Sequence, residues 1–502
     1  MKSYVAAVDC GTSAVKAAVF DLAGKVLGAG RRECPCRFLR DGRIEQSPES
    51  IAARTFSGLK DAVARSGVRP GRIAALAISN QRATVLRTDS RGQALGNAVS
   101  WQDMRGRREL EALGRRIGAP RYHAITGLPV NPVFSLAKIL ALQRGQPRRK
   151  AARFSLVQDH LLKRFGAADF FLDRSNASLT GMFDVEKLRW SAEILELAGV
   201  AESRLPVLVD SGAQVGAVSA AAARRCGLLA GTPLVSGGGD QQCAGIGAGA
   251  VRAGVAELTL GSAGVLLACV DRPRQDPGMR LACCAHAVPG KWVVEGLQNS
   301  AGSCLDWLSR LVSGKRFTGS FLRAAFAPAP GLRDPMFFPF LAGAGAPIWD
   351  PEARAMLLGL THAHDRAAVA RAILEGVSLE TKSIIDAFRA IRVPVRELRL
   401  TGGGSAIAGW TRMQADLFGI PVATLADPEA SVLGAGILAA WGAGAFPSLP
   451  EAADAMARVG RTFRPVPEHT RIYARRYAMY LDILERSASG GMLRMTARGR
   501  QP

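Results

Sequence analysis

The 502-residue sequence has no run of about twenty uncharged apolar residues, the length that a membrane-spanning helix requires. Its first residues, Met1 to Tyr4, lack the layout of a secretory signal and lead directly into a predicted strand. With 48% hydrophobic residues, the chain is too apolar for disorder and too long for one ordinary core. We therefore expect a cytoplasmic protein of two or more α/β domains without membrane contact.

Metal-site patterns are also missing, because the six histidines and nine cysteines do not cluster at metal-ligand spacing. Neither Cys34-Pro35-Cys36 nor Cys283-Cys284 has the spacing of a zinc ribbon. An odd number of cysteines scattered over a long chain fits reduced thiols better than a disulfide framework. We therefore expect free thiols.

Acidic residues are scarce beside basic ones, with 42 Asp and Glu against 65 Lys and Arg and a formal net charge of +23. The basic residues are almost all arginine and show no arm or recognition-helix pattern, so we predict no nucleic-acid binding. The charge would still attract nucleotides by general electrostatics. Residues 486–502 are expected to form a flexible basic tail. The oligomeric state stays open, with a homodimer as one option.

The stretch Ser236-Gly237-Gly238-Gly239-Asp240 ends an apolar run with three glycines and a carboxylate. Glycines at a strand end let a substrate approach the backbone closely, and the strand places the acid that follows. We interpret Asp240 as the catalytic base of a sugar kinase. The alternative is a simple tight turn, because turns are rich in both glycine and aspartate.

Residues 4–8 and 15–21 read as two strands of a hairpin, joined by the turn Asp9-Cys10-Gly11-Thr12-Ser13. Backbone N–H groups of such a turn can hold phosphate oxygens, and Asp9 is suited to bind Mg²⁺ directly or through water. The alternative is an ordinary hairpin. A similar arrangement recurs at residues 255–268, around Gly261-Ser262-Ala263-Gly264, which implies two similar domains.

A glycine loop, Thr401-Gly402-Gly403-Gly404-Ser405, follows a predicted strand and precedes a predicted helix over residues 410–418. Glycines before a helix expose N–H donors to a nucleotide phosphate or ribose. The chain has no Walker A sequence, which excludes a P-loop kinase.

Two further predicted strands, residues 73–79 and 98–100, end in polar side chains. Arg82 follows the first, and Trp101-Gln102-Asp103 follows the second. Strand ends are where α/β proteins bind ligands, so Trp101 could stack on a sugar while the other side chains hydrogen-bond its hydroxyls. The alternative for Trp101 is a place in the core.

Apolar spacing between these motifs predicts helices at residues 106–118, 135–143 and 159–165 and a hairpin over residues 169–184. We assign no chemistry to these segments. The small residues of 245–254 are expected at the domain boundary, either as a hinge or for close helix packing.

Together, the turn at residues 9–13, Asp240, Gly261-Ser262 and the loop 401–405 resemble the FGGY carbohydrate kinases. The resemblance implies two ribonuclease-H-like α/β domains of the actin, Hsp70 and hexokinase type, with ATP, Mg²⁺ and a sugar meeting in the cleft between them. It implies a sugar-binding and catalytic domain at residues 1–248 and a nucleotide-binding domain at 249–485. The implied ATP-binding residues are Gly11, Thr12, Ser13, Lys16, Gly261, Ser262, Gly302, Asp306, Gly402, Gly403, Gly404 and Ser405. The implied acceptor-binding residues are Arg82, Trp101, Gln102, Asp103, Asp240 and Gln241.

Two sub-family resemblances compete for the acceptor. Ala83 and Val133 stand where glycerol kinases have a glutamate and a tyrosine, while residues 284–292 and 300–307 resemble xylulokinases. Residues 343–347 lack a Gly-Glu-Arg that xylulokinases usually carry. We predict a ketopentose or related polyol, D-xylulose first, with glycerol as the alternative. Actin-like and Hsp70-type ATPases form a rival class, but they need no sugar pocket.

Overall fold

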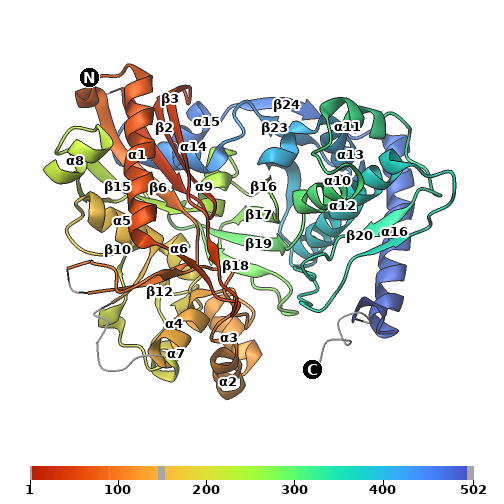
Figure 1. Ribbon diagram of the computed structural model, residues 1–502, viewed down its shortest axis with the longest axis horizontal. Coiled ribbons are helices and arrows are strands. Elements are labelled where there is room, and N and C mark those ends of the chain that lie inside the picture. Colours follow the sequence, from red (N-terminus) through yellow and green to blue (C-terminus); the bar gives the residue numbers. More distant parts are fainter. Residues whose placement is uncertain (1–2, 90, 145–152, 495–502) are drawn as a thin grey trace. The chain divides into compact units, whose positions relative to one another are not determined.

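The computed structural model describes residues 3–89, 91–144 and 153–494, and they fold into two compact units (Figure 1). The first unit comprises Met1–Arg252, Cys269–Val293 and Glu429–Arg458. The second comprises Ala253–Ala268, Val294–Pro428 and Val459–Pro502. Residues 269–293 and 429–458 thus belong to the first unit. The observed units therefore differ from the expected single division between residues 248 and 249. The assignment of catalysis to one domain and of the nucleotide to the other stays a prediction.

The first unit is built on a six-stranded sheet of order β14-β15-β6-β1-β2-β3. Strands β1, β2 and β3 form an antiparallel meander, while β6 and β15 run parallel to β1. The edge strand β14 is antiparallel to β15. The bounds are β1 (Tyr4–Cys10), β2 (Ala14–Asp21), β3 (Val26–Glu33), β6 (Ile73–Asn80), β14 (Gln214–Ala217) and β15 (Pro233–Gly239).

Both faces of this sheet are buried beneath helices. Successive side chains of a strand point to opposite faces, so each strand contributes to two cores. Ala6 and Val8 of β1 pack in one core, and Val5 and Ala7 pack in another. The first core is completed by α1 (Pro48–Ser66), α5 (Val157–Phe165) and α8 (Ala220–Cys226). The second is completed by α9 (Asp240–Gly247), α14 (Ala430–Gly442) and α15 (Leu449–Met456). Polar groups of this sheet are therefore concentrated at its strand ends.

A seven-stranded sheet has the order β18-β19-β17-β16-β22-β23-β24, with β18 at Ala282–Ala285. Its six strands from β24 to β19 repeat the strand order of the first sheet. Strands β16, β22 and β23 are parallel, β17 is antiparallel to β16, and β24 is antiparallel to β23. The repeat confirms the expected pair of ribonuclease-H-like domains. The bounds are β16 (Gly254–Leu260), β17 (Gly264–Val270), β19 (Trp292–Gln298), β22 (Val395–Thr401), β23 (Val422–Leu425) and β24 (Val459–Phe463). The accompanying elements are α10 (Gly302–Ser313), α11 (Gly319–Ala325), β20 (Met336–Phe338), β21 (Met356–Leu358), α12 (Arg366–Ala390), α13 (Ala408–Phe418) and α16 (Pro467–Ser489).

The first unit also carries a second sheet of order β4-β5-β8-β7-β9 and several short elements. The expected helices at 106–118, 135–143 and 159–165 are present as α2, α4 and α5. The bounds are β4 (Arg37–Phe38), β5 (Ile44–Gln46), β7 (Val85–Thr88), β8 (Ala98–Val99), α2 (Arg107–Ile117), α3 (Ala119–Thr126), α4 (Ser135–Arg144), β9 (Arg153–Leu156), β11 (Phe183–Asp184), β12 (Arg189–Trp190) and α7 (Ala192–Ala198).

The hairpin expected over residues 169–184 is wrong. Strand β10 (Phe171–Asp173) pairs in parallel with β13 (Val207–Val209), and the chain then enters α6 (Arg174–Ser178). The physical reason is a helix cap, because the carboxylate of Asp173 accepts a hydrogen bond from the backbone N–H of Ser175.

The carboxyl-terminal segment differs from the expected flexible tail at 486–502. Helix α16 continues to Ser489, Leu493 is buried, and Arg494 Nε lies 2.7 Å from Asp350 Oδ2. Residues 495–502 lie outside the described part of the chain.

All nine cysteines are free thiols. Within the described residues, no helix combines the length and hydropathy needed to cross a bilayer.

Lys138 of α4 joins two loops of the first unit from inside the protein. Its ammonium group is fully buried and contacts the carbonyl oxygens of Trp101, Pro132, Val133 and Phe134 at 2.6–3.3 Å. Burial lowers the pKa of Lys138 to about 7, and the charge of Asp103 opposes this. One lysine therefore ties the Trp101 loop to residues 132–134.

We predict that Lys138→Met lowers the thermal midpoint of the first unit by about 4 °C or more, because buried carbonyls lose their donor. The gap to the wild type should widen as pH rises from about 7 towards 10.5, because the unfolded chain then holds a proton that folded Lys138 has released. Lys163→Met is the matched control, since Lys163 contacts the carbonyls of Ala167 and Ala168 near the surface. Equal midpoints for the two variants would contradict the anchoring role.

Candidate active site

Gly237 lets the end of β15 approach β6 closely, and Gly239 lets it approach Arg82. A Cβ atom on Gly237 would lie 2.0 Å from the carbonyl oxygen of Ile78, and one on Gly239 would lie 2.4 Å from Cδ of Arg82. The backbone of Ile78 leaves no room for a side chain, so glycine is required at position 237, while a side chain at position 239 would have to displace that of Arg82. The next residue, Asp240, opens α9, and its position is set by this contact.

The side chain of Asp240 faces that of Arg82 across the two strand ends. Arg82 Nε lies 3.5 Å from Asp240 Oδ1, with the arginine side chain 7% exposed and the aspartate 26% exposed. Asp240 Oδ1 also accepts the N–H of Gln241 at 2.9 Å. Oε1 of Gln241 is buried and takes no hydrogen bond from any described residue. A buried acceptor of this kind suits a ligand hydroxyl.

The first β-strand ends at the same edge of the sheet, with Asp9 beside Ser79 of β6. Asp9 is 8% exposed, and Ser79 Oγ donates to Asp9 Oδ1 at 2.9 Å. Burial raises the pKa of Asp9, and the nearby Lys16 charge opposes the rise. Lys16 stands opposite Asp9 in the hairpin and pairs with Glu429. The structure therefore brings Asp9 and Asp240 to the ends of two strands that both flank β6.

The turn after β1 is held by a side chain of β5 and by one from the loop after β8. Gln46 Nε2 donates to the carbonyl of Thr12 at 2.8 Å, and Trp101 Nε1 donates to Thr12 Oγ1 at 2.9 Å. Gly11 and Thr12 are partly exposed, and Ser13 is exposed. Trp101 is half-buried, so it belongs neither to the core nor to the open surface. The predicted phosphate turn and the predicted sugar-stacking residue are thus in direct contact.

Asp103 lies inside the protein and is saturated by protein donors. Its carboxylate is 1% exposed and accepts four hydrogen bonds, one from the N–H of Ile44 and three from Arg105. Burial would raise the pKa of Asp103, but these hydrogen bonds hold it below its usual value. Asp103 thus supports the Trp101 loop, and its expected contact with the acceptor stays a prediction. Gln102 is half-buried, and no described residue hydrogen-bonds its side-chain amide.

In the second unit, the turn after β16 meets the start of α10. The N–H of Gly302 donates to the carbonyl of Gly261 at 2.9 Å, and Ser303 Oγ donates to the carbonyl of Ser262 at 2.8 Å. A Cβ atom on Gly302 would lie 2.7 Å from that Gly261 oxygen. The predicted residues Gly261, Ser262 and Gly302 are therefore adjacent. Asp306 lies one turn further along α10, 3.5 Å from Arg316 Nε.

The glycine loop of the second unit lies against the end of the same strand. Gly402 has a φ of 74°, and a Cβ there would lie 2.7 Å from the carbonyl oxygen of Leu260. Gly404 packs between Leu260 and Trp410, while Gly403 has open space around its Cα. Ser405 Oγ donates back to the carbonyl of Gly402 at 2.7 Å. The glycine loop and the turn after β16 therefore lie at the same strand end.

Several buried residues that support the site were not predicted. Asp173, Ser175 and Asn176 lie behind the end of β15, and Lys138 lies beneath the Trp101 loop. The aspartate at position 173, which caps α6, is the one sequence signal that could have located the first three.

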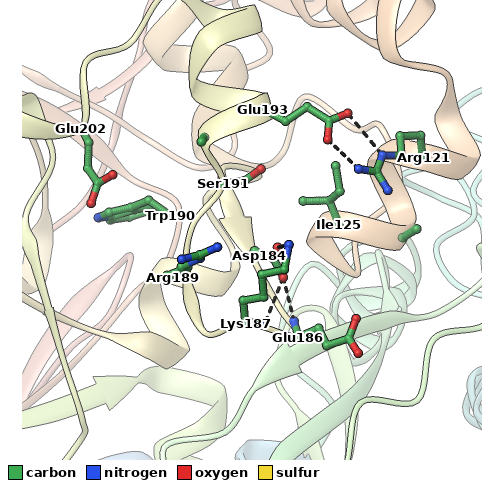
Figure 2. A pocket seen from close by; sticks show the side chains of 12 residues that line it. Arg121, Ile125, Asp184, Glu186, Lys187, Arg189, Trp190, Ser191, Glu193 and Glu202 are labelled. Atoms are coloured by element: carbon green, nitrogen blue, oxygen red, sulfur yellow. Dashed lines mark hydrogen bonds and ion pairs between the residues drawn. The ribbon is translucent and has the colours of Figure 1, made fainter.

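A pocket of about 530 Å³ lies elsewhere in the first unit and contains none of the predicted site residues. Figure 2 shows Arg121 forming two hydrogen bonds with Glu193, and Asp184 accepting the backbone N–H groups of Glu186 and Lys187. Since this pocket lies apart from the predicted residues, we do not assign the site to it.

The N-terminal domain model of the FGGY family of carbohydrate kinases matches residues 4–247, and the C-terminal domain model matches residues 257–443. A xylulose kinase from Bacillus subtilis (strain 168) is 29% identical over 482 residues, 96% of each chain. A glycerol kinase from Allorhizobium ampelinum is 33% identical over 93% of this chain and 95% of its own length. The crystal structure of xylulose kinase from Rhodospirillum rubrum superposes with a TM-score of 0.87 at 25% identity, covering 97% and 99% of the chains.

Two family models together match most of the chain, relatives match along nearly all of it, and the sheet order is repeated. These findings agree with one another. They make ATP a substrate and set aside the rival class of actin-like and Hsp70-type ATPases. The chain belongs to the FGGY family of carbohydrate kinases.

Proposed function

We propose that this kinase transfers the γ-phosphate of ATP to a hydroxyl of a ketopentose, with D-xylulose as the first acceptor and Asp240 as the general base. The observation that carries the proposal is the arrangement at the end of β15. There, Asp240 lies beside Arg82 and next to the buried, unpartnered Oε1 of Gln241. A carboxylate, a guanidinium and an amide oxygen at one strand end suit a small polyhydroxylated ligand.

Asp240 would accept the proton of the attacking hydroxyl. General-base help of this kind is worth about 10²–10⁴-fold in rate. The rest of phosphoryl transfer is positioning and electrostatic stabilisation, because little covalent chemistry falls to the protein. Arg82 Nε, 3.5 Å from the carboxylate, would help to keep Asp240 oriented.

We also propose that Mg²⁺ accompanies ATP and that Asp9 holds it, directly or through water. Among the described residues, no group of three or more His, Cys, Asp and Glu side chains could hold a metal. Mg²⁺ bound with a nucleotide needs only one or two carboxylates, since phosphates and water supply the other oxygens. Asp9 fits this need, because Ser79 donates to Oδ1 and no described residue hydrogen-bonds Oδ2. The ion would neutralise phosphate charge.

For the nucleotide, we propose the turns and loops at the strand ends. In the first unit these are Gly11, Thr12, Ser13 and Lys16, and in the second they are Gly261, Ser262, Gly302, Asp306, Gly402, Gly403, Gly404 and Ser405. Support comes from the contacts that hold the second group together around the end of β16. A cytoplasmic location and a homodimer stay predictions.

The choice of acceptor depends on positions 83 and 133, where the resemblance places a glutamate and a tyrosine in glycerol kinases. Ala83 is buried beside Arg82 with a φ of 60°, and Val133 is partly buried in the loop held by Lys138. Neither side chain can hydrogen-bond a hydroxyl. Glycerol remains the second candidate, because a glycerol kinase is as similar to this chain as the xylulose kinase is.

We predict that kcat/KM for D-xylulose exceeds that for glycerol at least about tenfold, a difference of roughly 1.4 kcal/mol in transition-state binding. The measurement is a coupled assay of ADP release with ketopentoses, polyols, glycerol and gluconate. Glycerol equalling or exceeding every pentulose would overturn the ketopentose assignment.

We predict that Asp240→Asn lowers kcat about 10²-fold or more and leaves ATP affinity nearly unchanged, because the amide keeps the shape but cannot accept the proton. Turnover is measured in the coupled assay, and ATP binding by calorimetry. The control is Asp454→Asn, since Asp454 is a surface aspartate of the same unit paired with Arg252. If Asp240→Asn turned over at the wild-type rate, Asp240 would not be the general base and would only form part of a turn.

A further inference from the structure

Behind the end of β15 lies a buried carboxylate that the proposed mechanism does not use. Asp173, fully buried at the end of β10, accepts hydrogen bonds from four neutral donors. These are the N–H and hydroxyl of Ser175, the side-chain amide of Asn176 at 2.6 Å and the hydroxyl of Ser211 at 3.0 Å. Burial raises the pKa of Asp173, and these hydrogen bonds oppose the rise. Burying a carboxylate costs free energy of folding, so its presence needs a structural or functional reason.

The first branch from Asp173 reaches the residue before the proposed base. The hydroxyl of Ser175 donates to Asp173 and accepts the backbone N–H of Gly239 at 2.9 Å. A hydroxyl that donates to a carboxylate is polarised and becomes a better acceptor. The N–H of Gly239, immediately before Asp240, is therefore held by a chain of two hydrogen bonds.

The second branch reaches the strand that carries Arg82. The side-chain amides of Asn176 and Asn80 exchange two hydrogen bonds, at 3.0 and 3.1 Å. Asn80 is the last residue of β6, two positions before Arg82, and stands opposite Gly239 in the sheet. One carboxylate thus holds the ends of both strands whose side chains face each other across 3.5 Å.

We propose that Asp173, Ser175 and Asn176 form a positioning network that sets the carboxylate of Asp240 for proton transfer. The inference rests on the proposed role of Asp240. None of the three residues contacts the reacting groups, so they act through the backbone of Gly239 and the side chain of Asn80. A displacement of about 1 Å at a reacting group can cost about 10²-fold in rate, so loss of this support should appear in kcat.

The test is a double-mutant cycle with Ser175→Ala and Asp240→Asn. Ser175→Ala should lower kcat about tenfold or more in the wild-type background, with KM for acceptor and ATP changed less than about threefold. In the Asp240→Asn background it should lower kcat less than about twofold, because the group that it positions is already disabled. Ser178→Ala is the matched control, since Ser178 is equally buried in α6 but donates to the carbonyl of Ser175.

The outcomes separate the two proposals. An equal loss in both backgrounds, or wild-type kcat in Ser175→Ala beside a slow Asp240→Asn, would overturn the network and leave the base standing. Wild-type turnover in Asp240→Asn would overturn both. If Ser175→Ala does not fold, Asp173→Asn replaces it, because asparagine still caps α6 but cannot accept all four hydrogen bonds. The same cycle with that variant must give the same pattern.

Discussion

The contact between β15 and β6 is the constraint on which the proposed site depends. Gly237 and Gly239 allow it, because any side chain there would collide with the backbone of Ile78 or the side chain of Arg82. The contact places Asp240 opposite Arg82, and the burial of both sheet faces leaves the strand ends as the place where polar groups gather. The chemistry of this unit therefore follows from backbone packing.

The second unit repeats the sheet order of the first with different groups at its strand ends. Its turn after β16, the start of α10 and the glycine loop 402–404 meet at one strand end, where backbone groups rather than acids predominate. The first unit adds to its sheet the small sheet, the Trp101 loop and the buried Lys138, which supply side chains around the strand ends. One sheet order with different additional elements thus places acids at the strand ends of one unit and glycine backbone at a strand end of the other.

The sequence predicted those parts that are local. Apolar runs located β1, β6 and β15, and an acid after a glycine strand located Asp240, because strand burial and turn chemistry leave direct marks on composition. The region 169–184 was missed because β10 and α6 span three and five residues and β10 pairs with a distant strand. The hydrogen bonds from Arg105 to Asp103 could not be predicted from the sequence, because only the fold shows them. Lys138 lies in a predicted helix to which the sequence assigned no chemistry, and its carbonyl partners are known only from the fold.

The central claim is that Asp240 receives the acceptor's proton. A crystal structure with D-xylulose and a non-hydrolysable ATP analogue tests it most directly. The account predicts one acceptor hydroxyl within about 2.6–3.2 Å of an Asp240 carboxylate oxygen, on the side facing the terminal phosphate. The claim would be contradicted if every hydroxyl of the bound acceptor lay too far from Asp240 for a hydrogen bond or a single bridging water, while the enzyme phosphorylated the same acceptor with ATP in solution.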